Sequence, residues 1–417
     1  MIDLLLRECR LPDGDAAVHI AIADGRIAGI GREAPAAREV IDVEGRLVTP
    51  GLVEAHIHLD KALLADRISA AAGTVEEAIR LTGEAKRGFT VEDIRARARQ
   101  VLDVAIAAGT TAMRTHVEVD PILGLAALEA MLPLKAEYAP AIDLQICAFA
   151  QEGILKAPGT EELLRRALTR GADLVGGCPY NDTDARQHIE IVFALARAFD
   201  VDADFHVDFF DEPEHLHVRQ VIEETLRAGW QGRVVVGHLT ELAALSAVEQ
   251  DAIVAELAAA GIGVIALPTT DLYLMGRRDE ANVRRGLTPL RRLLAAGVPV
   301  ALATNNVRNP FTPVGTADLA DLTFLTVVAG HMGTPREMRM LLDTITIHPA
   351  RMLRLPDYGL AVGRRADLVV WDCARPEDVV AALPPRLLVI KHGRVTIEHE
   401  RRTRERWREE RGSPDAP

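Results

Sequence analysis

Residues Pro50–Lys61 read PGLVEAHIHLDK, an apolar run that ends in two histidines separated by a single residue. Successive side chains of a β-strand point to opposite faces, so we expect His56 and His58 to lie on the same face. Two imidazoles at this spacing can bind one divalent metal ion. The motif equally fits a pair of hydrogen-bonded histidines in a protein core, and alone it does not decide between the two.

Seven further apolar runs follow this one, and stretches with helical periodicity separate them. Several of these stretches end in glycine just before the next run, where glycine supplies the left-handed C-terminal cap of a helix. Eight strand-then-helix units predict an α/β fold, a parallel (β/α)8 TIM-type barrel over residues 51–355. The alternative is an open doubly wound sheet, but no glycine-rich phosphate loop follows any early strand. The predicted strands are Leu52–His58, Thr111–Val117, Ile142–Phe149, Asp173–Cys178, Ala203–Val207, Val234–Leu239, Gly263–Leu267 and Val298–Ala303.

The two ends of the chain differ in pattern from the middle. Residues 1–50 contain short strand-like runs joined by glycine-containing turns, and residues 356–400 contain similar runs. We therefore expect both ends to build one small β-sandwich domain beside the barrel. Residues 401–417 are a charged tail, for which we expect a frayed helix or disorder.

The composition is that of an ordinary globular protein, with 48% hydrophobic and 26% charged residues in 417. The net charge of −13 disfavours nucleic-acid binding, because proteins that bind nucleic acid carry a basic surplus. No apolar run reaches the ~18 residues that a membrane helix needs, so we expect no membrane association and a cytoplasmic location. The cysteines are scattered, which favours buried reduced thiols over disulfides or a zinc knuckle. They are Cys9, Cys147, Cys178 and Cys373.

The predicted strands end in polar residues, and the C-terminal strand ends of such a barrel carry its chemistry. His206 ends strand five, and together with His56 and His58 it would bind a metal ion that keeps one coordination position open to activate water. Each single inward histidine can also be a hydrogen-bonded core residue. Further polar residues at the strand ends are His116, Gln151, Asp208, His238 and Asn305.

Several motifs, in this order along the chain, resemble the amidohydrolase superfamily and within it the cytosine deaminase branch. They are PGLVEAHIHLDKALL (Pro50–Leu64), RTHVEVD (Arg114–Asp120), DLQICAFAQEGIL (Asp143–Leu155), GADLVGGCPY (Gly171–Tyr180), HVDFFDE (His206–Glu212), GHLT (Gly237–Thr240), NPFTPVGTADL (Asn309–Leu319) and YGLAVGRRADLVVWD (Tyr358–Asp372). The resemblance covers nearly the whole chain. It implies a hydrolase of carbon–nitrogen bonds in small nitrogen heterocycles or cyclic amides, with one divalent ion, zinc or iron, held by His56, His58 and His206.

The resemblance also implies how the remaining residues act. Gln151 matches the amide that holds the edge of the pyrimidine ring. His238 matches the histidine that orients or polarises the group under attack. Lys61 matches a lysine of the related triazine-pathway hydrolases, the N-isopropylammelide isopropylaminohydrolases. We expect Lys61, Gln151 and His116 to contact the substrate and His238 to act in catalysis.

Two positions depart from the pattern of this branch. Strand eight normally ends in an aspartate that binds metal and accepts a proton, and here Asn305 stands in its place. An amide oxygen can coordinate a metal, but it has no charge and cannot take the proton. Cytosine deaminases also have a glutamate three residues after the strand-five histidine, where this chain has Phe209. We expect Asn305 to act in the site, with Asp208, Asp211 or Glu212 substituting for the missing carboxylates.

Two hypotheses from different classes follow. The first is a metal-dependent hydrolase with rearranged proton handling, which the retained histidines and Gln151 favour. The second is a barrel that has lost catalysis and binds a small ligand or a partner. Metal that copurifies in near-stoichiometric amount would favour the first. The expected partners are a small heterocyclic substrate and further copies of the chain in a homo-oligomer, without nucleic acid.

Overall fold

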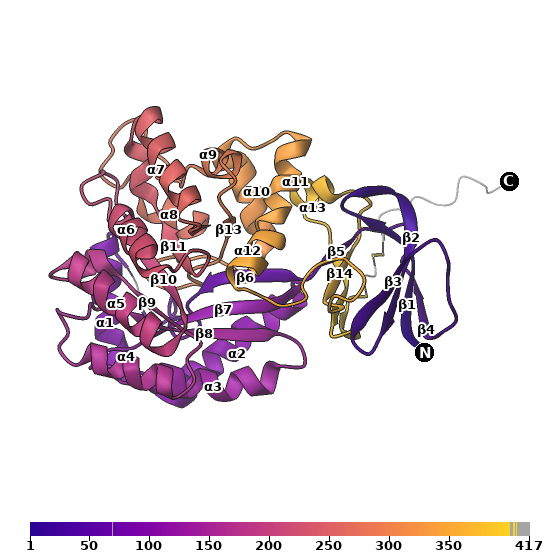
Figure 1. Ribbon diagram of the computed structural model, residues 1–417, viewed down its shortest axis with the longest axis horizontal. Helices are drawn as coiled ribbons and strands as arrows, with labels where there is room; N and C mark the ends of the chain where they lie inside the picture. Colours follow the sequence, from indigo (N-terminus) through magenta and orange to yellow (C-terminus); the bar gives the residue numbers. More distant parts are fainter. Residues whose placement is uncertain (69, 401–402, 405, 407–417) are drawn as a thin grey trace.

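Both ends of the chain meet in a small β-sandwich beside a larger α/β body (Figure 1). The computed structural model describes residues 1–68, 70–400, 403, 404 and 406, so most of the predicted tail, 401–417, lies outside the described residues. One sheet has the order β3-β2-β1-β4 and the other β16-β15-β14-β5. The strands are β1 (Ile2–Leu11), β2 (Gly14–Ala23), β3 (Arg26–Gly31), β4 (Ala37–Asp42), β5 (Val48–Pro50), β14 (Leu368–Trp371), β15 (Arg386–Lys391) and β16 (Arg394–Glu398).

The two sheets share a core of alternate apolar side chains, because each strand turns one face inward. Leu6 and Ile22 of the first sheet pack in one buried cluster with Val48, Leu368 and Ile390 of the second. Strand β5 runs directly into the first barrel strand, so the sandwich is attached to the barrel at the start of the segment that carries the paired histidines.

Eight parallel strands form the barrel, in the sheet order β13-β12-β11-β10-β9-β8-β7-β6. The ring closes between the last strand and the first, where His58 N donates to Asn305 O and Asn305 N donates to His56 O, both at 2.8 Å. The predicted (β/α)8 barrel with its β-sandwich is therefore confirmed. The barrel strands are β6 (Leu52–Ile57), β7 (Thr110–Glu118), β8 (Asp143–Ala150), β9 (Leu174–Gly177), β10 (Asp202–Val207), β11 (Val234–His238), β12 (Gly263–Ala266) and β13 (Val300–Leu302).

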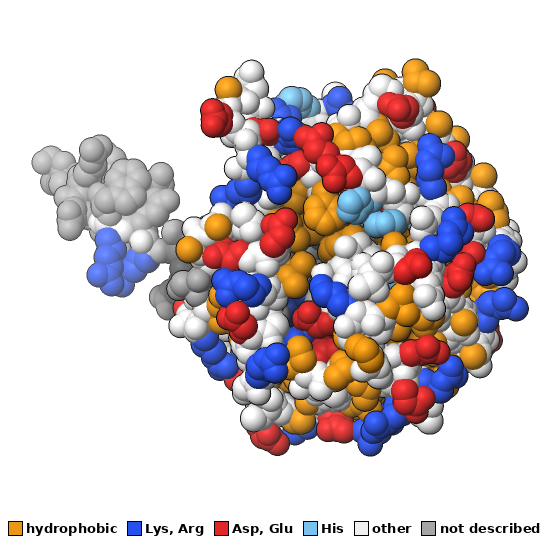
Figure 2. Space-filling view, turned by 90° about the vertical axis from the view of Figure 1, so that its left-hand side faces the viewer, with side chains coloured by type: hydrophobic (Ala, Val, Ile, Leu, Met, Phe, Trp, Pro, Cys, Tyr) orange, Lys and Arg blue, Asp and Glu red, His pale blue; other side chains and the backbone are white. Residues whose placement is uncertain are grey.

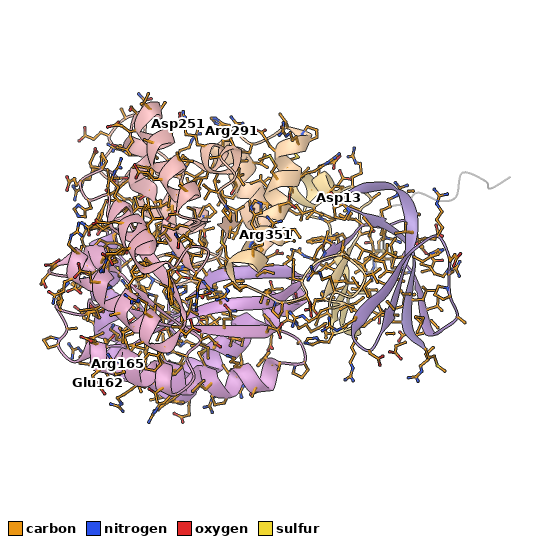
Figure 3. All side chains as sticks on the ribbon, in the orientation of Figure 1. Asp13, Glu162, Arg165, Asp251, Arg291 and Arg351 are labelled. Carbon is orange, nitrogen blue, oxygen red and sulfur yellow. The ribbon has the colours of Figure 1, made fainter. Side chains whose placement is uncertain are left out.

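Amphipathic helices surround these strands. In α4, for example, Leu164 and Leu168 are buried against the barrel, whereas Glu162 and Arg165 point outward from it (Figure 3). None of the helices within the described ranges has the length and apolar character to cross a membrane. The helices are α1 (Val75–Ala85), η1 (Lys86–Gly88), α2 (Val91–Ala107), α3 (Ala126–Tyr138), α4 (Thr160–Thr169), η2 (Pro179–Asn181), α5 (Ala185–Phe199), α6 (Val218–Ala228), η3 (Thr240–Ala244), α7 (Ala247–Ala259), α8 (Pro268–Leu274), α9 (Leu290–Ala295), α10 (Leu319–Gly330), α11 (Pro335–Asp343), α12 (Ile347–Met352) and α13 (Pro376–Ala382).

Strand β6 contains a bulge just before the paired histidines. Three residue steps from Glu54 to Ile57 pair with only two steps from Met113 to Thr115 on β7. A bulge inserts one extra residue and changes the face to which the following side chains point. Val53 before the bulge and Ala55 within it belong to an apolar cluster. The extra residue thus turns the end of β6 so that its histidines enter the polar site.

Candidate active site

Five histidines meet at the C-terminal end of the barrel. They are His56, His58, His116, His206 and His238, and each is at most 3% exposed. His56 is central: its ring centroid lies 4.0 Å from that of His116 and 4.4 Å from that of His206. The Nε2 atoms of His58 and His206 are 3.2 Å apart. Strands β6, β7, β10 and β11 therefore converge on one small volume, as expected for strand ends in a TIM-type barrel.

The backbone is strained where three strands of the barrel, β10, β11 and β13, end. Asp208, His238 and Asn305 adopt φ angles of 55°, 75° and 60°, in the left-handed region that residues with a side chain rarely enter. Such strain persists only where the surrounding structure imposes it, and it concentrates at functional sites. At these positions it turns the chain sharply away from the strand direction.

The cluster fits a divalent metal ion. Both ring nitrogens of His56 are buried without a hydrogen-bond partner among the described residues. Of the His116 nitrogens, Nδ1 likewise has none, whereas Nε2 lies 3.2 Å from Oδ1 of Asp204. Burial away from water lowers the pKa of His56, His58 and His206 well below the usual value, so these rings are neutral and carry free lone pairs. A metal ion satisfies such nitrogens, which would otherwise be costly to bury.

The structure enlarges the set of candidate ligands beyond the three predicted histidines. One ligand atom each from His56, His116, Asp204 and His206 lies within 4.8 Å of the others. Asp204 was not predicted, and His116, predicted to contact substrate, belongs to the same group. Asp204 comes from β10, two residues before His206, so its alternation along the strand was a signal that could have identified it. Its carboxylate accepts a hydrogen bond from Arg114 at 3.1 Å.

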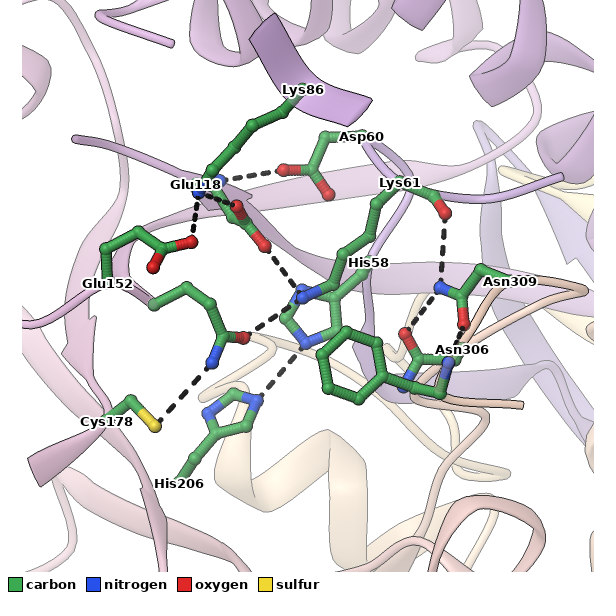
Figure 4. A network of polar contacts seen from close by, with 12 residues as sticks. His58, Asp60, Lys61, Lys86, Glu118, Glu152, Cys178, His206, Asn306 and Asn309 are labelled. Carbon is green, nitrogen blue, oxygen red and sulfur yellow. Dashed lines mark hydrogen bonds and ion pairs between the residues drawn. The ribbon is translucent and has the colours of Figure 1, made fainter. Parts of the chain in front are cut away.

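A buried network of charges lies beside the histidines (Figure 4). Lys61 Nζ donates to Glu118 Oε1 at 2.8 Å and to Gln151 Oε1 at 3.1 Å. Lys86 Nζ lies within 2.7 Å of carboxylate oxygens of Glu118, Asp120 and Glu152. Lys86 thus already supplies the cation among three carboxylates that could otherwise attract a metal ion.

The charged groups of this network shift the pKa values of one another. Burial raises the pKa of Glu118, but the two ammonium groups outweigh burial and lower it to about 2. Burial likewise lowers the pKa of Lys86, and its carboxylate partners raise it above the ordinary value. Glu118 and Lys86 are therefore both ionised near neutral pH, and Glu118 faces Lys61 as a carboxylate.

Asn305 lies where β13 meets β6, and its main chain closes the barrel as described above. Its Oδ1 atom is buried and has no hydrogen-bond partner among the described residues. Two more asparagines continue the loop: Asn309 Nδ2 donates to Lys61 O at 3.1 Å and to Asn306 Oδ1 at 2.8 Å. The end of strand eight is thus an amide-rich segment that supports Lys61.

Asp208 is not directed toward the histidines, contrary to the predicted catalytic role. Its carboxylate accepts hydrogen bonds from the backbone N–H groups of His217 at 2.7 Å and Val218 at 3.0 Å, at the start of α6. The N–H groups at a helix N-terminus need acceptors, and a carboxylate there is favourable. Asp211 accepts from Gly276 N, and Glu212 pairs with Arg284. The three carboxylates that might have substituted for the missing ones therefore serve the surrounding loops.

His238 has a carboxylate partner that sequence reasoning missed. Its Nδ1 atom lies 2.8 Å from Oδ1 of Asp271, a buried residue of α8. Phe209, at the position of the missing glutamate, stacks on the His238 ring with a centroid distance of 3.8 Å. Asp271 lies in the segment PTTD, directly after the seventh strand. Because residues that follow barrel strands lie near the active site, this position could have identified it.

Apolar side chains enclose the site. Phe311 lies against Lys61, whose Nζ is 4.7 Å from the ring centroid. It clusters with Phe209, with Val75 of α1, with Leu274 of α8 and with Met275, which directly follows α8. Figure 2 shows a face of the molecule where hydrophobic and surface histidine side chains lie among charged ones. The polar groups at the strand ends thus lie below an apolar cover, as in sites for small organic ligands.

Comparisons with known proteins agree with this geometry. A family model described as "Amidohydrolase family" matches residues 39–397. The chain is 28% identical over 407 residues to an N-isopropylammelide isopropyl amidohydrolase of Pseudomonas sp. (strain ADP), covering 95% of this chain and 98% of that protein. These findings confirm the resemblance that the motifs indicated.

Two solved structures are also similar. A 5-methylcytosine deaminase from Klebsiella pneumoniae, liganded with 5-fluorocytosine, superposes with a TM-score of 0.92 at 32% identity, covering 96% of this chain and 99% of that one. An N-isopropylammelide isopropylaminohydrolase from Burkholderia multivorans superposes with a TM-score of 0.84 at 30% identity, covering 95% and 99%. Both similarities extend over the sandwich as well as the barrel.

Proposed function

The chain belongs to the amidohydrolase family, and on this premise we propose that it hydrolyses a carbon–nitrogen bond of a small nitrogen heterocycle or cyclic amide with the help of a divalent metal ion. The observation that carries the proposal is the cluster of buried histidines at the C-terminal end of the barrel, in which both ring nitrogens of His56 and the Nδ1 atoms of His58 and His206 have no hydrogen-bond partner among the described residues. Relatives of this family named for deamination or removal of an amine support the reaction class.

The proposed metal ligands are His56, His58 and His206, with His116 and Asp204 near enough to join or exchange with them. Imidazole and carboxylate donors suit zinc or ferrous iron. An ion of this kind supplies a Lewis acid that makes water a stronger nucleophile at neutral pH. Arg114, which binds Asp204, holds that carboxylate toward the cluster.

Gln151 and Lys61 are proposed to bind the polar edge of the substrate. An ammonium group only donates, so the Gln151 atom 3.1 Å from Lys61 Nζ must be its oxygen. The amide nitrogen therefore points the other way, 3.7 Å from Cys178 Sγ. With its oxygen engaged, Gln151 offers N–H donors, and Lys61 adds a positive charge. Such an edge favours a substrate with adjacent acceptors, for example a ring carbonyl beside an unprotonated ring nitrogen.

His238 is the proposed proton carrier. Asn305 and Phe209 stand where the branch has its proton-handling carboxylates, and Asp208 is engaged by α6. An imidazole can both accept and donate a proton, and His238 lies next to the cluster, with its ring centroid 5.5 Å from that of His206. Asn305 is proposed to orient substrate or water through its unpaired amide oxygen.

A catalytically decayed barrel that binds a small ligand or a partner is the second candidate. Asn305 and Phe209 favour it, because both replacements remove a group that accepts protons. The retention of the histidine cluster, Gln151 and Lys61 favours the hydrolase, since binding alone does not require unpartnered ring nitrogens. Near-stoichiometric metal in the purified protein would support the hydrolase.

A substrate screen tests the proposal. Zinc-loaded and iron-loaded protein would be incubated with cyclic ureides, oxopyrimidines and alkylamino-triazines, and released ammonia or amine would be measured. We expect turnover of at least one class by the wild type and none by His206→Ala. Absence of both bound metal and turnover would support the decayed barrel.

The proposed setting of this activity is the cytoplasm, in a homo-oligomer. The four cysteines, all of which the structure describes, are free thiols. Scattered unpaired thiols are typical of reducing compartments. Size-exclusion chromatography with light scattering measures the oligomeric state directly.

A further inference from the structure

Asp271 is a buried carboxylate with two defined contacts. Oδ1 lies 2.8 Å from Nδ1 of His238, and Oδ2 accepts a hydrogen bond from the backbone N–H of Leu267 at 3.3 Å. Burial raises the pKa of Asp271, and the contact with His238 acts in the opposite direction. A buried carboxylate needs such partners, because leaving it unpaired would be costly.

Both the ring and the backbone of His238 are held in place. Phe209 stacks on one face with an interplanar angle of 28°. Thr288 Oγ1 donates to the carbonyl oxygen of His238 at 2.5 Å. His238 and Leu239 are both left-handed, with φ angles of 75° and 57°. These constraints leave the imidazole little freedom, and Asp271 determines which of its nitrogens carries the proton.

An ionised carboxylate only accepts hydrogen bonds, so a proton on Nδ1 lies toward Asp271 and Nε2 keeps its lone pair. Among the residues that the structure describes, no hydrogen bond uses Nε2 of His238. That nitrogen is therefore the one available to take a proton from a reacting group. A carboxylate behind an imidazole plays the same part in other hydrolases, where it holds the tautomer and stabilises the imidazolium.

We propose that Asp271 is the positioning residue for His238, and that His238, held in this way, takes over the proton-accepting role of the carboxylate that is absent at Asn305. This inference rests on the proposed hydrolase activity. As the oxygen of water bonds to the carbon under attack, His238 Nε2 takes a proton from that water. The same proton then passes to the nitrogen of the breaking carbon–nitrogen bond, so the imidazole ends neutral and Asp271 gains no proton.

The first test needs no substrate. Two-dimensional ¹⁵N–¹H NMR of the histidine rings, on metal-free and on zinc-loaded protein, reports the tautomer of each imidazole. We expect the Nδ1–H form for His238 in the wild type. In Asp271→Asn, the single amide oxygen is drawn to Leu267 N and the amide donates to Nδ1, which shifts His238 to the Nε2–H form. His188, whose Nδ1 is 2.7 Å from Asp182 in a separate pair, is the internal control and should not change.

The second test separates a positioning role from a structural one. With a substrate from the screen, Asp271→Asn should lower kcat by about 10²–10⁴-fold and leave KM nearly unchanged. In a His238→Ala background, the same change should cause no further loss, because Asp271 acts only through His238. If Asp271→Asn lowered kcat by the same factor in the wild type and in His238→Ala, the proposal would be wrong.

The wild-type spectrum keeps the inference falsifiable if the variant does not fold. An Nε2–H tautomer in the wild type would mean that a protonated Asp271 donates to Nδ1, and the proposed relay would be wrong. Failure of the substrate screen would contradict the proposed function and leave the tautomer result standing, so the two failures are distinguishable.

Discussion

His58 and His206, from opposite sides of the barrel, face each other with their Nε2 atoms 3.2 Å apart. Burial lowers the pKa of both rings, so neither is a stable cation at neutral pH. Two neutral imidazoles at this distance either share one proton in a hydrogen bond or direct both lone pairs at a cation. The two ring nitrogens of His56 nearby, which have no hydrogen-bond partner among the described residues, favour the cation.

The metal content provides the first prediction. Wild-type protein should carry close to one zinc or iron per chain, and His206→Ala should carry markedly less, because it removes the ligand from the far side of the barrel. Elemental analysis by plasma mass spectrometry measures both. His19→Ala, on β2 of the sandwich, is the matched control and should keep its metal. Unchanged content in His206→Ala would refute the assignment.

Substrate binding should depend on Gln151. Gln151→Ala removes the donors of the amide and should raise KM by about 10- to 100-fold, the effect of one lost buried hydrogen bond, with a smaller change in kcat. Steady-state kinetics on the substrate found by the screen checks this split. A loss confined to kcat would assign Gln151 to the chemical step instead.

His238→Ala should change kcat and leave KM nearly unchanged. Removal of the proton carrier should lower kcat by about 10²–10⁴-fold, while KM changes little, because the polar edge formed by Gln151 and Lys61 remains. Near-wild-type kcat would return His238 to the role of a buried structural histidine.

Asn305 distinguishes the two candidate functions. If His238 and Asp271 handle protons, Asn305→Asp should bring no large gain in turnover of the native substrate. If the chain is a decayed deaminase, Asn305→Asp combined with Phe209→Glu should restore release of ammonia from cytosine. Cytosine turnover by the double variant would therefore argue against the proposed function.

Lys86 should be important for stability. Lys86→Met leaves Glu118, Asp120 and Glu152 buried together without their shared cation, and we expect a loss of about 3–5 kcal/mol in the free energy of unfolding. Urea denaturation followed by circular dichroism measures it. The exposed Lys156→Met should stay within about 0.5 kcal/mol of the wild type. Similar stability of both variants would show that the network tolerates the missing charge.

The fold and much of the site could be predicted from the sequence, because both depend on local patterns. Each predicted strand overlaps an observed one, since parallel barrel strands are short apolar runs between helices. Alternation along a strand predicts that His56 and His58 share one face. It does not predict the bulge in β6 that turns this face toward the site. A bulge depends on how two strands pair, and β7 lies far along the chain from β6.

Partners that are distant in sequence could not be predicted. Asp208 was predicted to be catalytic because it follows His206, yet the N–H groups of α6 bind its carboxylate. Asp271 was missed because its role is visible only once α8 lies beside β11. Periodicity shows which side of an element a residue occupies, whereas the tertiary structure determines which group it meets there.

The main-chain hydrogen bonds between Asn305 and the two histidines of β6 have a consequence for folding. They join the first and last strands of the barrel, so the site lies at the contact with the greatest sequence separation in the ring. Contacts of this kind form late, because the intervening chain must first be ordered. A nascent chain that lacks strand eight holds the histidines of β6 without the strand that aligns them. Activity therefore appears only when the final segment of the barrel has been synthesised and has docked.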